Sequence, residues 1–300
     1  MGFFRKALRE IKRVKALWKR KKEYWLLLKG VFLRSKLLSP NDKDDLIVSL
    51  TTYNKRLDKV HVTIESLLQQ SRKPNRIILW LYEGEVRALS HYLKFQQTRG
   101  VEIRFVDENL KSFKKLLYTY KEFPTSNIIT VDDDIIYPKT FIEKFEAAAL
   151  EFPGSILCYR AKLIEMDSQD SLKPYKSLIY ACKMQKPSHK ILPIGCSGIY
   201  YPPNSLHRFV LNKEYATLLC DNADDIWFKV MALMSGVKAN LVLDSSIHFP
   251  LTYATQSDSL HKLNNVDESN NGSKNDKALK QTINVVNKMF NTNLYKSLSE

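Results

Sequence analysis

The sequence is poor in the residues that would build a disulfide framework or a zinc site. Its 300 residues include only four cysteines, Cys158, Cys182, Cys196 and Cys220, and no two of them form a Cys-x-x-Cys pair. No cluster of cysteine and histidine has the spacing of a structural zinc site. We therefore interpret the cysteines as reduced, mostly buried thiols of a cytosolic protein.

Long apolar segments are missing as well. No apolar run approaches the roughly 20 residues that a membrane-spanning helix requires. Basic residues recur throughout the first 38 positions and no small-residue cleavage site follows them, which argues against a secretory signal peptide. Lys6 occupies the position that myristoylation of Gly2 requires as serine or threonine. We expect no spanning helix, no signal peptide and no myristoyl anchor.

Acidic residues are scarce in the N-terminal segment. Residues 1–38 contain 13 Lys and Arg against Glu10 and Glu23, a net charge of +11 that leaves +4 of the total +15 for the other 262 residues. Apolar residues, including Trp18 and Trp25, recur between the basic ones at helical spacing. This pattern predicts a basic amphipathic helix on an anionic membrane surface, where each basic residue contributes about 1 kcal/mol. Two alternatives are a helix packed on the protein itself or on a partner, and a nucleic-acid-binding tail.

The rest of the chain has the composition of a folded protein, with 44% hydrophobic and 11% aromatic residues. Buried-strand and helical patterns alternate along it. The expected strands are 46–50, 76–81, 101–106, 127–131, 155–159 and 237–243, with a loop and strand at 192–201, and the expected helices are 57–70, 111–121, 141–150, 226–234 and 278–290. The first four strands alternate with helices, which predicts a right-handed, mostly parallel, doubly wound α/β sheet. Residues 161–190 show no clear period, and residues 253–276 are expected to be mobile.

Three adjacent carboxylates, Asp132, Asp133 and Asp134, directly follow the expected strand at 127–131. An unpaired buried charge is very costly, so these residues must lie at the carboxyl end of the strand, where open α/β sheets bind their ligands. Side chains at i and i+2 of an extended chain point the same way, so Asp132 and Asp134 can approach one cation. Such a site suits Mg²⁺ or Mn²⁺ with water and phosphate oxygens as further ligands. The alternative is a solvated acidic turn.

Five motifs, in order, resemble GT-A glycosyltransferases, in particular the family-2-like sugar transferases of bacterial surface polysaccharides such as lipopolysaccharide or capsule. They are Val-Ser-Leu-Thr-Thr-Tyr-Asn-Lys-Arg (48–56), Glu-Ser-Leu-Leu-Gln-Gln-Ser (65–71), Val-Asp-Asp-Asp (131–134), Tyr-Pro-Pro-Asn-Ser-Leu (201–206) and Ala-Asp-Asp-Ile-Trp (223–227). The resemblance covers about residues 44–290. It implies a GT-A (Rossmann-like) fold, with mostly parallel strands flanked by helices.

This resemblance also divides the chain. Residues 1–40 would form the basic helical extension and residues 41–300 the catalytic domain. Within that domain, the nucleotide-sugar half would span about 44–135 and the acceptor half about 136–250. A C-terminal loop and helix would follow at 251–300.

The resemblance further assigns roles on the donor side. Thr51, Tyr53 and Arg56 would contact the nucleotide, with Glu83 or Asp107 near the base or ribose. Asp132 and Asp134 would hold Mn²⁺ or Mg²⁺ against the diphosphate, with Asp133 in the same donor site. Lys111 and Lys115 would be phosphate partners, or they form a solvated helix face. His248 or His261 would be a third metal ligand, or a structural histidine. Gly195 and Gly198 would permit close approach of the substrate, or they serve as plain turns.

On the acceptor side, Asp224 or Asp225 is the candidate general base, which would make the reaction an inverting displacement. The alternative is that one of them only caps the helix expected at 226. The implied reaction is metal-dependent transfer from a nucleotide sugar, with UDP-sugar as the expected donor, to a saccharide or lipid-linked saccharide. The implied location is cytoplasmic, peripheral on the inner face of the cell membrane.

Three rival functions use some of the same features. A sugar-nucleotide nucleotidyltransferase shares a similar sheet, but it should carry a glycine-rich first loop, which Ser-Leu-Thr-Thr-Tyr (49–53) is not. A metal-dependent phosphoesterase should carry further histidine ligands near other strand ends. A non-enzymatic basic protein that binds membranes or nucleic acid would not confine its charge to one tail.

Overall fold

The computed structural model describes residues 17–31, 46–253 except 87 and 170, and 273–299. A seven-stranded sheet has the order β3-β2-β1-β4-β8-β5-β9. Its strands are β1 (Leu46–Thr51), β2 (Arg76–Tyr82), β3 (Val101–Val106), β4 (Asn127–Thr130), β5 (Ile156–Cys158), β8 (Ile199–Tyr201) and β9 (Ala239–Leu241). Only β8 runs antiparallel to its neighbours in this sheet. The mostly parallel α/β fold is therefore confirmed.

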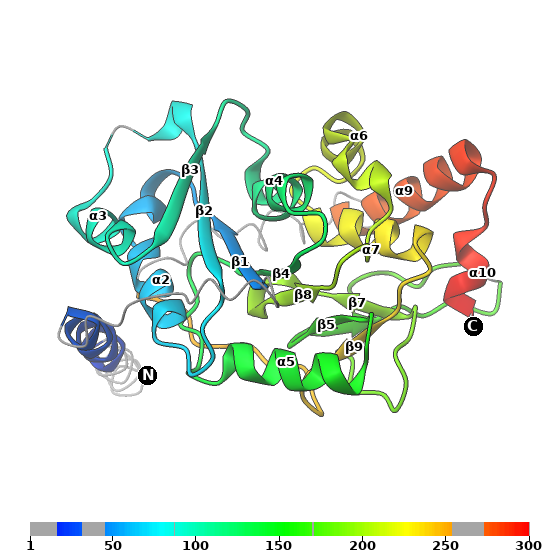
Figure 1. Ribbon diagram of the computed structural model, residues 1–300. Coiled ribbons are helices and arrows are strands. Elements are labelled where there is room, and N and C mark those ends of the chain that lie inside the picture. The colour runs from blue at the N-terminus through cyan, green and yellow to red at the C-terminus, as the bar shows by residue number, and fades with distance from the viewer. Residues whose placement is uncertain (1–16, 32–45, 87, 170, 254–272, 300) are drawn as a thin grey trace, which may run out of the picture.

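Helices cover both faces of this sheet (Figure 1). One face packs against α2 (Val60–Leu68), α3 (His91–Gln97) and α5 (Phe141–Glu151). The other side of the sheet carries α4 (Lys114–Glu122) and α7 (Asp224–Met234). Three further helices pack against α7 on that side, namely α6 (Lys213–Leu219), α9 (Lys274–Phe290) and α10 (Leu294–Ser299). A separate antiparallel pair, β6 (Ala161–Leu163) and β7 (Ile191–Pro193), lies beside the second half of the sheet.

The continuous apolar runs of the central strands have a direct structural cause. In β4, Ile128 packs in the cluster formed with α4 and α7, whereas its neighbour Ile129 packs in the cluster formed with α2 and α5. Ile47 and Val48 of β1 divide between the two faces in the same way. Because successive side chains of a strand alternate between faces, a strand covered on both sides must be apolar at every position.

Several expected boundaries differ from the structure. The helix expected at 111–121 begins as a 3-10 turn at Lys111–Phe113, where Lys111 has a φ of 51°, and becomes α4 only at Lys114. The helix expected at 57–70 is likewise split into a 3-10 turn and α2. The last long helix begins at Lys274 rather than 278, because Ser273 and Asp276 form a reciprocal capping box. Most of the segment expected to be mobile, 254–272, lies outside the described residues.

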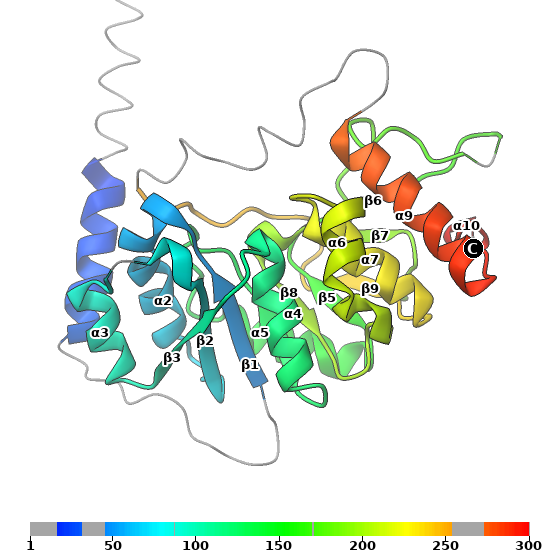
Figure 2. The ribbon, with the colours of Figure 1, turned by 90° about the horizontal axis from the view of Figure 1, so that it is seen from above.

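A helix at residues 17–31 lies beside α2 (Figure 2). Gln69 Nε2 donates a hydrogen bond to the Leu26 carbonyl at 2.8 Å, and Arg20 donates one to the Tyr253 hydroxyl at 2.9 Å. The other side of the helix is solvent-exposed, with Trp18 62% and Trp25 60% accessible. This segment is thus helical as predicted, and it packs partly on the protein's own body. Among the described residues, each helix is either too short or too polar to span a bilayer.

Candidate active site

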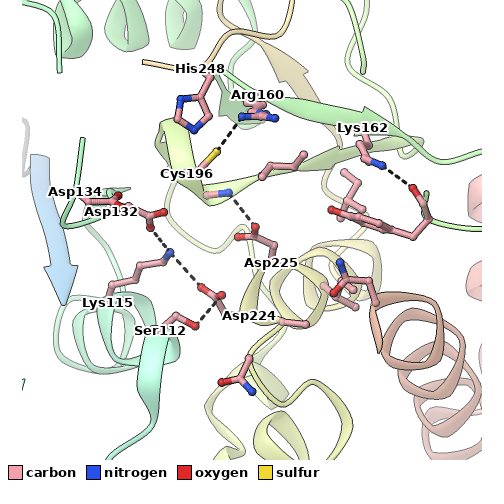
Figure 3. Close-up of a pocket in the computed structure, with 18 of the residues that line it drawn as sticks. Ser112, Lys115, Asp132, Asp134, Arg160, Lys162, Cys196, Asp224, Asp225 and His248 are labelled. Carbon is pink, nitrogen blue, oxygen red and sulfur yellow. Dashed lines mark hydrogen bonds and ion pairs between the residues drawn. The ribbon is translucent and has the colours of Figure 1, made fainter. Parts of the chain in front are cut away.

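A pocket of about 740 Å³ lies where the carboxyl end of β4 faces the N-terminus of α7. Asp132 and Asp134 follow β4, Lys115 comes from α4, and Asp224 and Asp225 form the first turn of α7. All five line the pocket, and Figure 3 shows the labelled acidic side chains gathered around Lys115 and the loop at Cys196. The candidate site thus lies at the carboxyl edge of the sheet, where open α/β sheets bind their ligands.

The three consecutive acids point in two directions. Asp133 is buried away from the pocket, where it accepts a hydrogen bond from Thr52 Oγ1 at 2.5 Å and pairs with Arg56 at 2.8 Å. Asp132 and Asp134 both line the pocket, as the i, i+2 spacing predicted. Asp133 therefore anchors the loop, and its neighbours are left for a ligand.

Asp134 is short of positive charge. Arg56 Nη2 lies 3.2 Å from Asp134 Oδ2, but Arg56 also neutralises Asp133. Burial and the nearby charge of Asp132 raise the pKa of Asp134 to about 7. A cation bound by Asp132 and Asp134 would relieve this repulsion, so the two carboxylates fit Mg²⁺ or Mn²⁺.

Further protein ligands for such a cation are few. No three His, Cys, Asp or Glu side chains are close enough to hold a metal within the described parts of the chain. His248 lines the same pocket, and its Nδ1 lies 2.7 Å from the Phe249 carbonyl oxygen. The predicted alternative ligand His261 lies outside the described residues. A metal here would therefore depend on the two carboxylates together with water and substrate phosphate oxygens.

Lys115 links the two acidic groups of the pocket. Its side chain is almost fully buried, with Nζ 3.0 Å from Asp132 Oδ1 and 3.2 Å from Asp224 Oδ2. Burial alone would lower the pKa of Lys115, but Asp132 and Asp224 outweigh that effect and raise it well above its ordinary value. Lys115 is therefore a fixed positive charge, and the alternative of a solvated lysine on a helix face is wrong for it.

The two acids of α7 have different surroundings. Asp224 Oδ1 accepts a hydrogen bond from Ser112 Oγ at 2.9 Å, and Oδ2 faces Lys115. Asp225 Oδ2 accepts from the Gly195 N–H at 2.9 Å, whereas Oδ1 is buried and has no hydrogen-bond partner among the described residues. Burial and the charge of Asp224 raise the pKa of Asp225 to about 7. Asp225 is thus the carboxylate better suited to accept a proton.

Neither acid caps α7. The residue before the helix is Ala223, and no side chain caps the first turn. The interpretation of Asp224 or Asp225 as a cap is therefore wrong, because both lie inside the helix and face partners from other elements.

Gly195 and Gly198, the two glycines before β8, have different roles. A Cβ on Gly195 would lie 2.8 Å from Asp225 Oδ1 and 3.1 Å from Lys115 Nζ, so glycine permits this loop to touch the acidic site. Gly198 has a φ of 91°, and a Cβ there would lie 2.6 Å from the Phe141 ring. Gly198 is not part of the pocket lining, and its role is to turn the chain against the core.

Other predicted nucleotide contacts lie outside the pocket lining. Thr51 donates a hydrogen bond to the Trp80 carbonyl at 2.8 Å, and the Tyr53 ring lies 5.3 Å from the Arg56 guanidinium. Lys111 forms an exposed ion pair with Asp221 at 2.6 Å, and its position in the 3-10 turn separates it from Lys115. Glu83 and Asp107 are exposed where β2 and β3 end. The predicted residues that the pocket does bring together are Arg56, Lys115, Asp132, Asp134, Gly195, Asp224, Asp225 and His248.

Sequence reasoning missed one side of the pocket. Arg160, Lys162, Tyr175 and Tyr180 line it, together with Cys196 and Ser112. The two tyrosines and Lys162 come from the aperiodic segment 161–190, whose only signal was its richness in Lys and Tyr. That signal does not show which of these side chains converge.

Comparisons with known proteins complete this description. The family model described as glycosyl transferase family 64 domain matches residues 46–189, which hold the first four strands, Lys115 and the three consecutive acids. No curated protein matches the sequence.

Structural neighbours are distant. They include S. aureus TarS 1–349 (14% identity, 68% of this chain, 59% of that chain, TM-score 0.43). The mannosyltransferase PcManGT from Pyrobaculum calidifontis in complex with GDP-Man and Mn²⁺ also matches (11% identity, 76% and 66% coverage, TM-score 0.42). A third match is 4-diphosphocytidyl-2C-methyl-D-erythritol synthase (9% identity, 74% and 96% coverage, TM-score 0.41). Likenesses at this level carry no argument about function.

The family match agrees with the position of the acidic pocket at the carboxyl edge of a mostly parallel sheet. The model that matches describes family 64, whereas the sequence motifs resembled family 2. Both are sugar transferases, and the chain described here is a glycosyltransferase with a mostly parallel α/β fold.

Proposed function

We propose that this glycosyltransferase transfers a sugar from a nucleoside diphosphate donor, with UDP-sugar as the expected donor, to a hydroxyl group of a saccharide or lipid-linked saccharide. The proposed metal ion is Mn²⁺ or Mg²⁺. One observation carries the proposal: Asp132 and Asp134 share a pocket with a second carboxylate, Asp225, whose Oδ1 has no hydrogen-bond partner among the described residues. Glycosyl transfer needs both groups, a site for the leaving diphosphate and an acceptor for a proton.

On the donor side, Asp132 and Asp134 would bind the metal ion, and Arg56 would hold Asp134 in place. When bound, the metal would offset the negative charge that develops on the departing diphosphate. Lys115 keeps a permanent positive charge beside Asp132, which favours phosphate oxygens in the same part of the pocket. Thr51, Tyr53, Glu83 and Asp107 remain proposed contacts for the nucleoside, which would extend beyond the pocket toward the ends of β1 to β3.

On the acceptor side, Asp225 would remove the proton of the attacking hydroxyl. The acceptor oxygen then forms a bond to the anomeric carbon as the bond from that carbon to the diphosphate breaks. Attack from the face opposite the leaving group inverts the anomeric centre. The hydrogen bond from the Gly195 N–H fixes Asp225 Oδ2 and leaves Oδ1 for the proton.

Nucleotide binding and turnover test this proposal together. We expect UDP with Mn²⁺ to raise the free energy of unfolding by about 2.7 kcal/mol at a free concentration about 100 times its Kd. GDP and CMP serve as comparison nucleotides, and Asp132→Asn should remove the metal-dependent part of the effect. Incubation with a panel of nucleotide sugars and saccharide acceptors should release the nucleoside diphosphate. If none of the nucleotides stabilises the protein with or without Mn²⁺, the proposed donor class is wrong.

We also propose that the helix at 17–31 holds the enzyme peripherally on the anionic, cytoplasmic face of the cell membrane. Trp18 and Trp25 are exposed on this helix, and so are Lys19, Lys21 and Lys22. The side that includes Gly30 packs closely against Glu65 of α2, which fixes the helix on the body and directs the tryptophans outward. Exposed tryptophan next to lysine is typical of helices that lie in a membrane interface.

A further inference from the structure

The side of the pocket away from Asp134 is basic and aromatic. In Figure 3, Asp225 lies between Asp132 on one side and Lys162 on the other, with Arg160 near the loop at Cys196. Arg160 follows β5, and Lys162 lies in β6. Neither residue has a part in the proposed metal binding or proton transfer.

Two tyrosines hold these cations in place. The Arg160 guanidinium lies 4.8 Å from the centroid of the Tyr180 ring and donates a hydrogen bond to the Tyr180 hydroxyl. Lys162 Nζ lies 4.2 Å from the centroid of the Tyr175 ring and donates to the Tyr175 carbonyl at 2.5 Å. Cation–π contacts and hydrogen bonds to neutral groups position both charges without neutralising them.

No carboxylate forms an ion pair with Arg160 or Lys162 in the described parts of the chain. Arg160 Nη1 contacts the Cys196 thiol at 3.6 Å, and burial raises the pKa of that thiol to about 11, so it is neutral. Asp276 is the acid that acts on Lys162, but its carboxylate already accepts hydrogen bonds from Tyr175 N–H at 2.5 Å and Ser273 N–H at 2.8 Å. Burial and the charge of Arg160 lower the pKa of Lys162, as expected for two cations without an anion between them.

We propose that the acceptor is an anionic saccharide and that Arg160 and Lys162 bind its carboxylate or phosphate group. The inference rests on the proposed function, which assigns the donor diphosphate to Asp132 and Asp134. Because Asp225 lies between those acids and Lys162, an anion beyond Asp225 belongs to the molecule that Asp225 deprotonates. Arg160 presents a planar fork of donors that matches a carboxylate or a phosphate, and Lys162 adds a point charge.

Binding of three small saccharides to the full chain, with UDP and Mn²⁺ present, tests the proposal. The probes are methyl glucuronide, glucose 6-phosphate and neutral methyl glucoside, and the dissociation constants are measured by titration calorimetry or ligand-observed NMR. We expect at least one anionic probe to bind about tenfold or more tightly than methyl glucoside. The preferred probe tells whether the natural group is a carboxylate or a phosphate. Equal binding of the three probes by the wild-type protein would overturn the proposal.

Charge-removing variants connect this preference to the two residues. Arg160→Gln and Lys162→Gln should each reduce the preference for the anionic probe about tenfold, and Arg160→Lys should retain part of it. Lys173→Gln is the matched control, because Lys173 lies on the same segment but is exposed and paired with Glu165 at 2.6 Å. Thermal unfolding of each variant shows that it is folded. If Arg160→Gln does not fold, Lys162→Gln and Arg160→Lys carry the test, and an unchanged preference in both overturns the assignment.

Affinity for UDP with Mn²⁺ in the same variants separates acceptor from donor. An unchanged affinity supports an acceptor role for Arg160 and Lys162. A loss of about tenfold or more would assign these residues to the donor phosphates and overturn the proposal. If the wild-type protein prefers the anionic saccharides but binds no nucleoside diphosphate, the anion site stands and the proposed glycosyl transfer from such donors fails.

Discussion

At the scale of single residues, the acids of the pocket differ in whether they form an ion pair with Lys115. Lys115 forms an ion pair with Asp132 and with Asp224, so each of these two carboxylates has a positive partner at close range. Asp134 and Asp225 receive less compensation, and the pKa of each is raised to about 7. A metal ion bound at Asp134, or a proton accepted by Asp225, would reduce the uncompensated negative charge at that carboxylate. Each of these two acids gives a prediction.

We predict that Asp134→Ala abolishes turnover and leaves the fold intact. Removing this carboxylate should cost several kcal/mol of transition-state stabilisation if it holds the metal ion, on the order of 10³-fold in kcat/KM. The assay is sugar transfer at saturating Mn²⁺, with circular dichroism and thermal unfolding as controls for folding. Wild-type activity of this variant would contradict the assignment of Asp134 as a metal ligand.

We also predict that Asp225→Asn and Asp224→Asn have unequal effects. Loss of the base in Asp225→Asn should lower kcat about 10²-fold or more with little change in donor binding. Asp224→Asn should instead lower the free energy of unfolding by about 1–3 kcal/mol, because Lys115 loses one of its two anionic partners. Wild-type kcat/KM should rise with pH through about 7, as Asp225 must lose its proton to act. Full kcat in both variants would favour a retaining mechanism.

At the scale of elements, the turn before β8 contacts both the hydrophobic core, at Gly198, and the acidic pocket, at Gly195. Gly198→Ala should lower the free energy of unfolding by about 2–4 kcal/mol, because it places a side chain at a φ of 91° and against the Phe141 ring. Gly195→Ala is the matched comparison. Its Cβ meets the flexible end of Asp225, so kcat should fall about tenfold or more while stability changes less. Denaturant unfolding and transfer assays of both variants measure the contrast, and equal stability losses would contradict it.

The helix at 17–31 gives a second prediction at this scale. Trp18→Ala with Trp25→Ala should release the protein from vesicles of anionic lipid, because both side chains are exposed and available to a membrane interface. Cosedimentation with vesicles measures this effect. The control replaces Leu150 and Leu218, which are 84% and 77% exposed on other helices, by alanine. Retained binding of the tryptophan double variant would place the membrane contact elsewhere.

At the scale of the whole molecule, the free energy of unfolding should depend on pH through the raised pKa of Asp134. Asp134 binds a proton more tightly in the folded protein than in the unfolded chain, so between about pH 4 and 7 the folded state carries more protons. This group therefore stabilises the fold less as pH rises through that window. In EDTA, the advantage of Asp134→Asn over the wild-type protein in unfolding free energy should grow from pH 5 to pH 8.

Metal addition is the control for this prediction. Mn²⁺ at pH 8 should stabilise the wild-type protein and leave Asp134→Asn nearly unchanged, because the ion replaces the proton as the partner of the carboxylates. Urea unfolding at each pH, with and without Mn²⁺, measures both effects. A pH-independent difference between the two proteins would show that Asp134 has an ordinary pKa.

The sequence by itself determined the strands and the common orientation of Asp132 and Asp134. Apolar runs such as 46–50 and 127–131 mark strands covered on both faces, and the alternation of side chains along an extended chain places Asp132 and Asp134 on the same side. These are local consequences of backbone geometry, and they could be predicted without knowledge of the packing. The sequence did not separate Asp133 from this donor site, and only the structure shows it paired with Thr52 and Arg56 outside the pocket lining. The same reasoning could only give alternatives for Asp224 and Asp225, since the register of a helix start depends on its surroundings.

Only the tertiary structure decided how the site is shared among distant segments. Gly195 lies 30 residues from Asp225 and Ser112 lies 112 residues from Asp224, yet these contacts distinguish the base candidate from the ion-paired acid. Arg160 and Lys162 enter the pocket from a region without a regular period, so no local pattern indicates where their side chains lie. Periodicity fixes which face a residue belongs to, but burial and opposing charges, which set pKa values and the choice of partner, arise only when the segments pack together.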